Sequence, residues 1–271
     1  MRPSPEQLAL LNRTERVSFE IADFLAQHKL TPASEAYLTL VLGAIIWSCG
    51  GRRLDVRGIQ QFDGMGKKDR VIIVANHRSF FDFFSITAIL YWRTNLTKRI
   101  FFPTRSTFFY DHPAGPAVNL AMSAMRMFPP ILRDKKKSSF NDFAMDRLIE
   151  ELKIPGTIVG VHPEGTRNKS EDPYELLPAQ IGVGKLALNV DPEVKVIPAF
   201  VLGMGNSLPS ELKMNVLEPE AHKIDLFFGA PIDFSDLRAK GARLATYKRA
   251  ADRCMEHIKA LAERQRQESG A

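Results

Sequence analysis

The first part of the chain contains two consecutive helical patterns of different character. Over Glu6–Lys29 apolar residues recur at spacings of three and four among charged ones, which predicts an amphipathic helix. Thr31-Pro32 is expected to end it, and Ser34 is a suitable N-cap for a second helix. Ala36–Gly51 carries no charged residue, and Arg52-Arg53 follow at once. A membrane-spanning helix needs about 20 apolar residues, so this shorter run is predicted to lie in one leaflet or to be an ordinary buried helix.

After residue 53 short apolar runs alternate with helical segments. Continuous apolar runs between turn residues predict buried strands, and longer amphipathic segments predict helices. The predicted strands are Val71–Ala75, Ile100–Phe102, Thr157–Val161, Lys195–Val201 and Lys223–Phe228, and the predicted helices are Asp82–Trp92, Phe140–Leu152 and Leu244–Arg266. This alternation predicts an α/β fold with a central, mostly parallel sheet that is covered by helices.

The same patterns divide the chain into three parts. Residues 1–53 are expected to form an N-terminal two-helix extension that lies at a membrane interface. Residues 54–265 are expected to form the α/β domain, and residues 266–271 a frayed tail. The length of 271 residues fits one large domain and is ample for a sizeable core.

Charge and cysteine content narrow the class of protein. Lys and Arg number 37 against 31 Asp and Glu, so the net charge is +6. A positive charge can attract nucleic acid or an anionic membrane, but the charge is dispersed and the chain has no helix-turn-helix, zinc-finger or RNA-binding signature. An anionic membrane surface is therefore the expected partner, and nucleic acid is not. Cys49 and Cys254 provide neither a disulfide framework nor a four-thiolate zinc site, and they fit a reducing, cytosolic side.

The first candidate site follows the predicted strand Val71–Ala75, where the chain reads Asn-His-Arg-Ser-Phe-Phe-Asp. The carboxyl ends of strands are where sites gather in α/β proteins. If His77 lies in the turn and Asp82 in the first helical turn, the carboxylate can accept from one ring nitrogen and leave the other to take a proton. Such a dyad has no nucleophile of its own, so the nucleophile would be a substrate hydroxyl. A helix cap or a surface ion pair is the alternative.

The second candidate site follows the predicted strand Thr157–Val161 and reads His-Pro-Glu-Gly-Thr-Arg. Gly165 permits a tight turn, and the planar fork of Arg167 suits a phosphate, to which Thr166 and the turn amides can add donors. A structural turn with an Arg–Glu ion pair is the alternative. The His-x-Glu pair also occurs in zinc deaminases, but these need a downstream Pro-Cys-x-x-Cys that the isolated Cys254 cannot supply.

Together the two blocks resemble the glycerolipid acyltransferases typified by 1-acylglycerol-3-phosphate O-acyltransferase. The resemblance rests on Asn-His-x-x-x-x-Asp at Asn76–Asp82 and on Pro-Glu-Gly-Thr-Arg at Pro163–Arg167. Phe128–Arg133 and Val196–Ala199 are similar, more loosely, to the family's second and fourth blocks. The chain departs from the family pattern at His162, where Phe is usual, and before Gly182, where a Lys is common.

The resemblance implies a reaction and a set of residues. The reaction moves a fatty acyl group from acyl-CoA or acyl carrier protein to the hydroxyl of a lysophospholipid, with 1-acylglycerol 3-phosphate as the favoured acceptor and phosphatidic acid as the product. His77 would be the general base and Asp82 would orient it. The residues that would bind the acceptor are Arg133, Glu164, Gly165, Thr166 and Arg167. No metal or cofactor is expected, because the thioester is already activated.

Several alternatives stay open. The acceptor could instead be lyso-ornithine lipid, glycerol 3-phosphate or a glycolipid, or the chain could be a non-catalytic lipid-binding or carrier-binding homologue. The donors for the tetrahedral oxyanion could be amides near Gly165 or near Asn76-His77. The pairs Phe80-Phe81, Phe83-Phe84, Phe101-Phe102 and Phe108-Phe109 could line an acyl-chain site or simply fill the core. The expected location is the cytoplasmic face of a membrane, as a peripheral or monotopic protein.

Overall fold

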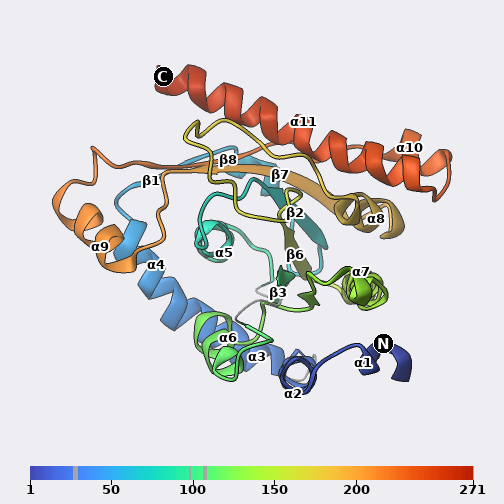
Figure 1. Cartoon of the computed structure of the whole chain (residues 1–271). Helices are drawn as coiled ribbons and strands as arrows, with labels where there is room; N and C mark the ends of the chain where they lie inside the picture. Colours follow the sequence, from blue (N-terminus) through green and yellow to red (C-terminus); the bar gives the residue numbers. More distant parts are fainter. Residues whose placement is uncertain (27–29, 98, 106–108, 271) are drawn as a thin grey trace.

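A computed structural model describes residues 1–26, 30–97, 99–105 and 109–270, and a six-stranded sheet lies at its centre (Figure 1). The strand order is β1-β8-β7-β2-β6-β3, and all neighbours are parallel except β7 and β8. The strands are β1 (Leu54–Arg57), β2 (Val71–Ala75), β3 (Arg99–Phe101), β6 (Thr157–Val161), β7 (Lys195–Leu202) and β8 (Ile224–Phe228). The predicted α/β fold with a mostly parallel sheet is confirmed.

Side chains of the central strand β2 alternate between two hydrophobic cores, one on each face of the sheet. Ile72 and Val74 belong to the first core, and Val71, Ile73 and Ala75 to the second. Because both faces are covered, the strand is a continuous apolar run in sequence. The first face is covered by α7 (Ser138–Glu151), α8 (Ile181–Asn189) and α11 (Leu244–Ser269), and the second by α4 (Gly43–Gly50) and α5 (Asp82–Arg93) (Figure 1).

The ends of the chain differ from the predicted pattern. The expected amphipathic helix is two helices, α1 (Pro5–Ala9) and α2 (Arg13–Leu25), because Asn12 caps α2 by accepting the backbone N–H of Glu15. The last part of the predicted helix, residues 27–29, lies outside the described residues. At the other end α11 continues to Ser269, so most of the expected frayed tail is helical; residue 271 lies outside the description.

The apolar N-terminal helix begins earlier than predicted. It starts as α3 (Thr31–Tyr37), passes through a π-helical turn, η2 (Leu38–Leu42), and continues as α4. Pro32 therefore lies in the first helical turn, where its missing N–H costs nothing, and Ser34 lies inside the helix rather than at its cap. Within the described part of the chain, Pro32–Gly50 is the one helix long and apolar enough to cross a membrane by length and composition.

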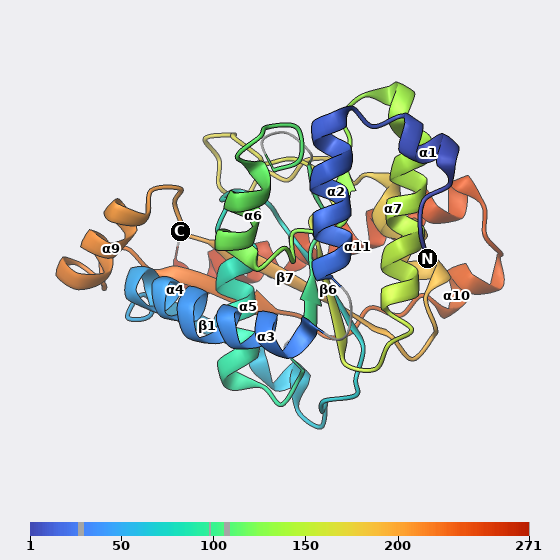
Figure 2. The same cartoon turned by 90° about the horizontal axis from the view of Figure 1, so that it is seen from below.

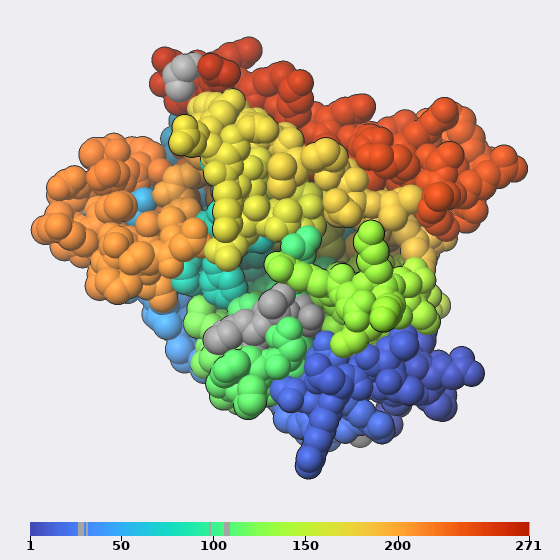
Figure 3. Space-filling model, in the orientation of Figure 1, coloured from blue at the N-terminus to red at the C-terminus, as the bar shows by residue number. Residues whose placement is uncertain are grey.

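The N-terminal helices share the core of the α/β domain. Phe19 of α2 stacks on Phe128 at 5.9 Å between ring centroids and packs edge-on against Phe140 and Phe143 of α7. Figure 3 shows this blue N-terminal segment lying directly against the green one. The α2 helix therefore packs directly against the helical layer of the α/β domain.

The remaining elements lie on the rim of the sheet. A separate pair of parallel strands, β4 (Thr104–Arg105) and β5 (Pro130–Ile131), is joined by a segment that contains α6 (Gly115–Ser123). The helices α9 (Leu208–Leu217) and α10 (Ser235–Ala239) follow β7 and β8. Figure 2 shows α2, α3, α4, α6 and α9 on the side of the molecule seen from below.

Candidate active site

His77 and Asp82 lie together at the carboxyl end of β2. Asp82 is the first residue of α5 and is 2% exposed, and its Oδ2 lies 3.2 Å from Nδ1 of His77. The same oxygen accepts the backbone N–H groups of Arg78 and Ser79, each at 2.8 Å. A carboxylate held in this way makes Nδ1 of His77 the donor and leaves Nε2 available for a substrate. The structure therefore brings the two residues together as the spacing predicts.

Burial sets the protonation of this pair. Burial, followed by the charges of Arg167 and Arg105, lowers the pKa of His77 to about 3. Burial raises the pKa of Asp82 to about 6, against the opposing effects of His162 and the backbone N–H donors. Near neutral pH the carboxylate is therefore charged and the imidazole is neutral, which is the state that a general base requires.

Glu164 connects the two candidate sites through the backbone. It is 1% exposed, and its two carboxylate oxygens accept the backbone N–H groups of His77 at 2.9 Å and Leu177 at 3.0 Å. The buried carboxylate therefore joins the loop that carries His77 to the segment that carries Leu177.

Arg167 is exposed, and its partner is a residue that the sequence analysis missed. Its guanidinium donates to Oδ1 of Asn206 at 3.1 Å, and the same oxygen accepts the backbone N–H of Phe80 at 2.8 Å. Asn206 lies between β7 and α9, on a stretch that includes Gly203 and Gly205. A single exposed Asn in such a loop has no local signal that would have identified it.

A second missed residue is Arg105, which forms a group of positive charges with Arg133 and Arg167. The pairing of β4 with β5 places Arg105 opposite Ile131, two residues before Arg133. Burial and then the charge of Arg133 lower the pKa of Arg105, and Arg105 and Arg167 in turn lower the pKa of His77. Two guanidinium groups near the base, and a third near Arg105, make this region suited to a phosphate.

Gly165 forms the tight turn that the motif predicts. Its φ is +64°, and a Cβ atom at this position would lie 2.8 Å from Cγ of Gln180. Gln180 also donates its backbone N–H to the carbonyl of Pro163 at 2.8 Å. The glycine is thus required by conformation and by close packing, and Thr166 follows it as a half-buried residue of the same turn.

The backbone amides of the site separate into occupied and available donors. The N–H of His77 donates to Glu164, and the N–H of Gly165 donates to the carbonyl of His162 at 2.9 Å. In the described residues, the N–H groups of Thr166 and Arg167 donate to no protein acceptor. Among the amides considered for an oxyanion, those of Thr166 and Arg167 are therefore available, whereas those of His77 and Gly165 are occupied.

The ligand atoms of His77, Asp82 and His162 lie within 4.8 Å of one another, a spacing that also has to be tested for a metal ion. The two imidazole rings are stacked with an interplanar angle of 7°. Nitrogen lone pairs lie in the ring plane, so those of two parallel rings do not converge on one point. In addition, Oδ2 of Asp82 already accepts two N–H groups. The arrangement fits proton transfer better than metal binding.

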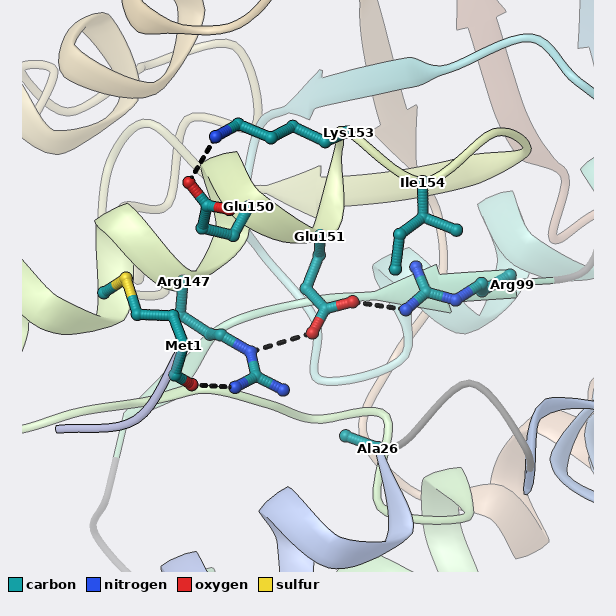
Figure 4. Close-up of a pocket in the computed structure, with 8 residues that line it drawn as sticks. All are labelled: Met1, Ala26, Arg99, Arg147, Glu150, Glu151, Lys153 and Ile154. Carbon is teal, nitrogen blue, oxygen red and sulfur yellow. Dashed lines mark hydrogen bonds and ion pairs between the residues drawn. The ribbon is translucent and has the colours of Figure 1, made fainter.

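A cavity of about 440 Å³ lies away from this site (Figure 4). Arg99, which begins β3, lines it at the amino ends of the strands, whereas His77 follows the carboxyl end of β2. Arg99 and Arg147 both pair with Glu151 across the cavity (Figure 4). Both arginines of this cavity are thus held by the same carboxylate.

Two of the phenylalanines considered for an acyl chain line a narrow apolar gap. Phe84 of α5 and Phe102 face Leu38, Leu42 and other residues of the apolar N-terminal helix across a space of about 20 Å³. This volume is that of about one water molecule, so a fatty chain would fit only if the helix moved away from α5. The predicted pair member Phe108 lies outside the described residues.

One known family matches the part of the chain that holds this site. The model of the family described as Acyltransferase matches residues 53–202, more than half of the chain. The chain belongs to the acyltransferase family. The matched segment contains His77, Asp82, Arg133 and the Glu164–Arg167 turn, whereas Asn206 lies just beyond it. No curated protein matches the chain significantly.

Proposed function

We propose that the protein transfers a fatty acyl group from acyl-CoA or acyl carrier protein to the hydroxyl of a lysophospholipid, with His77 as general base. The observation that carries this proposal is the 3.2 Å contact between Nδ1 of His77 and the buried carboxylate of Asp82, with Arg105 and Arg167 near enough to lower the pKa of His77. A pair of this kind can deprotonate a hydroxyl, and the arginines can hold the phosphate of the molecule that carries it.

The proposed reaction balances without a cofactor. Nε2 of His77 takes the proton of the acceptor hydroxyl while its oxygen attacks the thioester carbonyl. The oxyanion of the tetrahedral intermediate would be stabilised by the free N–H groups of Thr166 and Arg167. The carbon–sulfur bond then breaks, and the leaving thiolate takes the proton from His77. Asp82 stabilises the imidazolium throughout and keeps Nδ1 as its donor.

The arginines favour 1-acylglycerol 3-phosphate among the possible acceptors. Its phosphomonoester carries between one and two negative charges near pH 7, more than a phosphodiester or an ornithine headgroup carries. Arg105, Arg133 and Arg167 together supply three positive charges to meet it. Glycerol 3-phosphate shares this group, whereas lyso-ornithine lipids and neutral glycolipids lack it, so a panel of acceptors separates these alternatives.

We also propose that the protein binds the cytoplasmic face of an anionic membrane as a peripheral or monotopic protein. Exposed apolar side chains occur on four elements of the chain. They are Val17, Ile21 and Phe24 on α2, Leu40, Val41, Ile45 and Trp47 on the apolar N-terminal helix, Leu120 on α6, and Leu212, Val216 and Leu217 on α9. Exposed apolar side chains on helices, in a chain with a net charge of +6, are the composition that an anionic lipid interface attracts.

Transfer of labelled palmitoyl-CoA to the acceptor panel tests the catalytic proposal. Wild-type protein should acylate 1-acylglycerol 3-phosphate, and His77→Ala should reduce kcat by at least about 10²-fold, the contribution of a general base. The matched control is His257→Ala, which changes an exposed histidine of α11. A His77→Ala protein that transfers at near the wild-type rate would refute the mechanism. A parallel assay with palmitoyl acyl carrier protein identifies the donor.

A further inference from the structure

The imidazole of His162 lies flat against that of His77. The two ring centroids are 3.7 Å apart and their planes differ by 7°. The ring of His162 also contacts Phe83 of α5, at 4.2 Å between centroids. One face of His77 is therefore covered by an aromatic ring, and water is excluded from it.

The ring of His162 is itself fixed by a polar anchor. Its Nδ1 lies 3.0 Å from the carbonyl oxygen of Ala75, and because a carbonyl only accepts, this nitrogen carries a proton. Ala75 is the last residue of β2, two residues before His77. The orientation of the His162 ring is thus tied to the strand from which His77 projects. A phenylalanine could stack in the same place but could not make this bond.

We propose that His162 is a positioning residue for the reaction, whose anchored ring holds the imidazole of His77 in one plane and keeps water from its covered face. The inference rests on the proposed role of His77 as base. An uncharged ring at this position fixes the orientation of the base, and by excluding water it keeps the base in the neutral form that accepts a proton.

His162 remains uncharged because of its surroundings. Burial, followed by the charge of His77, lowers the pKa of His162 to about 3. The charged groups around the two rings are Asp82 from α5, Arg78 and Glu164 from the loops after β2 and β6, Arg105 from β4 and Arg167 from the turn after Gly165. The carboxylate of Asp82 can neutralise the positive charge of one imidazolium. Because Asp82 contacts His77, His77 is the ring that carries this charge during the reaction.

Two substitutions distinguish the effect of the stacked ring from that of its hydrogen bond to Ala75. His162→Phe keeps an aromatic face and removes the N–H, whereas His162→Gln keeps an N–H donor and removes the ring. The expected result for His162→Gln is a loss of roughly 10-fold to 100-fold in kcat, because a misplaced base is costly, with the KM for the acceptor nearly unchanged. His162→Phe should retain most of kcat. His257→Gln, an exposed change on α11, is the control.

A second measurement does not depend on catalysis. In protein with isotope-labelled histidine, nuclear magnetic resonance follows the titration of His77 directly. Removing the covering ring admits water, so His162→Gln should raise the pKa of His77 toward its ordinary value by about one unit or more, and His162→Phe should leave it low. The acidic limb of the pH profile of kcat/KM should shift to higher pH in His162→Gln by the same amount.

These outcomes separate the inference from the proposed function. If His162→Gln is folded by circular dichroism but keeps the wild-type kcat and the wild-type titration of His77, the positioning role is refuted. If His162→Gln does not fold, the titration of His77 in His162→Phe decides: an ordinary pKa there refutes the role. If wild-type protein transfers no acyl group to any acceptor while the titration shifts as expected, the proposed function fails and the role of His162 in orienting the ring stands.

Discussion

The carboxylate of Glu164 accepts the backbone N–H of His77 at 2.9 Å and so joins two loops that lie 87 residues apart in the sequence. From the same turn, the backbone N–H of Asn168 donates to the carbonyl of His77 at 2.7 Å. The backbone of the proposed base is therefore held on both sides by the segment that also carries Arg167. The distance between the base and the proposed phosphate-binding residue depends on these two bonds.

Replacing Glu164 should affect both stability and catalysis. Glu164→Gln keeps one acceptor but turns an N–H donor toward one of the two backbone N–H groups, so we expect a loss of about 1–3 kcal/mol in the free energy of unfolding. We expect kcat to fall as well, because the loop that carries His77 shifts. Urea unfolding and acyl-transfer kinetics measure the two effects. Glu171→Gln, an exposed change in the same segment, is the control, and equal effects of the two variants would contradict this role.

Asn206 offers a test of the phosphate-binding arginine. Asn206→Ala removes the acceptor that orients Arg167, and we expect the KM for the acceptor to rise about 3-fold to 10-fold while kcat changes little. Asn206→Asp keeps the acceptor and adds a negative charge, which competes with the phosphate, so KM should rise further. Ser210→Ala on α9 is the control. Unchanged KM values in both variants would exclude Arg167 as a phosphate ligand.

The two stacked histidines should make stability depend on pH. Each has a folded-state pKa of about 3 against an ordinary value of 6.5, so the unfolded state binds more protons and stability is lost as pH falls below 6.5. Asp82 has the opposite effect on stability between pH 3.8 and about pH 6, because its carboxyl group is protonated in the folded state and ionised in the unfolded state. Between pH 4 and 6 the unfolded state therefore binds about one proton more than the folded state. The free energy of unfolding should fall by about 1.4 kcal/mol for each pH unit of acidification.

His162→Phe removes one of these histidines and should make the stability nearly independent of pH in this range. Urea unfolding at several pH values between 4 and 6 measures the slope for wild type and variant. The exposed control His257→Phe should leave the wild-type slope in place. A variant slope equal to that of wild type would mean that His162 does not titrate differently in the folded and unfolded states.

The parts of the fold that the sequence predicts best are those with local patterns. The bounds of β2 and β6 are predicted to the residue, because strands buried on both faces are continuous apolar runs. The contact between His77 and Asp82 is also predictable, because both lie in one short turn. β1 was missed because it is four residues long and alternates apolar with charged residues at the edge of the sheet.

The rest of the site depends on contacts between distant segments. Arg105 lies near His77 because β4 pairs with β5, and Asn206 meets Arg167 because the loop after β7 crosses both motifs. Neither contact has a periodicity or a motif that marks it. The backbone partners of Glu164 were not predictable for a related reason. A neighbouring arginine is the obvious local partner, but two backbone N–H groups from other segments satisfy the buried carboxylate.

The apolar side of the molecule leads to a prediction about membrane binding. Leu40 is 72% exposed on the apolar N-terminal helix, so Leu40→Glu should leave the core intact. If this side lies on lipid, the change should weaken binding to phosphatidylcholine–phosphatidylglycerol vesicles by about 10-fold or more, the cost of removing a leucine from an apolar environment. Sedimentation with vesicles measures it. Leu244→Glu is the matched control, because Leu244 is 75% exposed at the start of α11, on the opposite face of the sheet. Equal vesicle binding by the two variants would place the lipid contact elsewhere on the molecule.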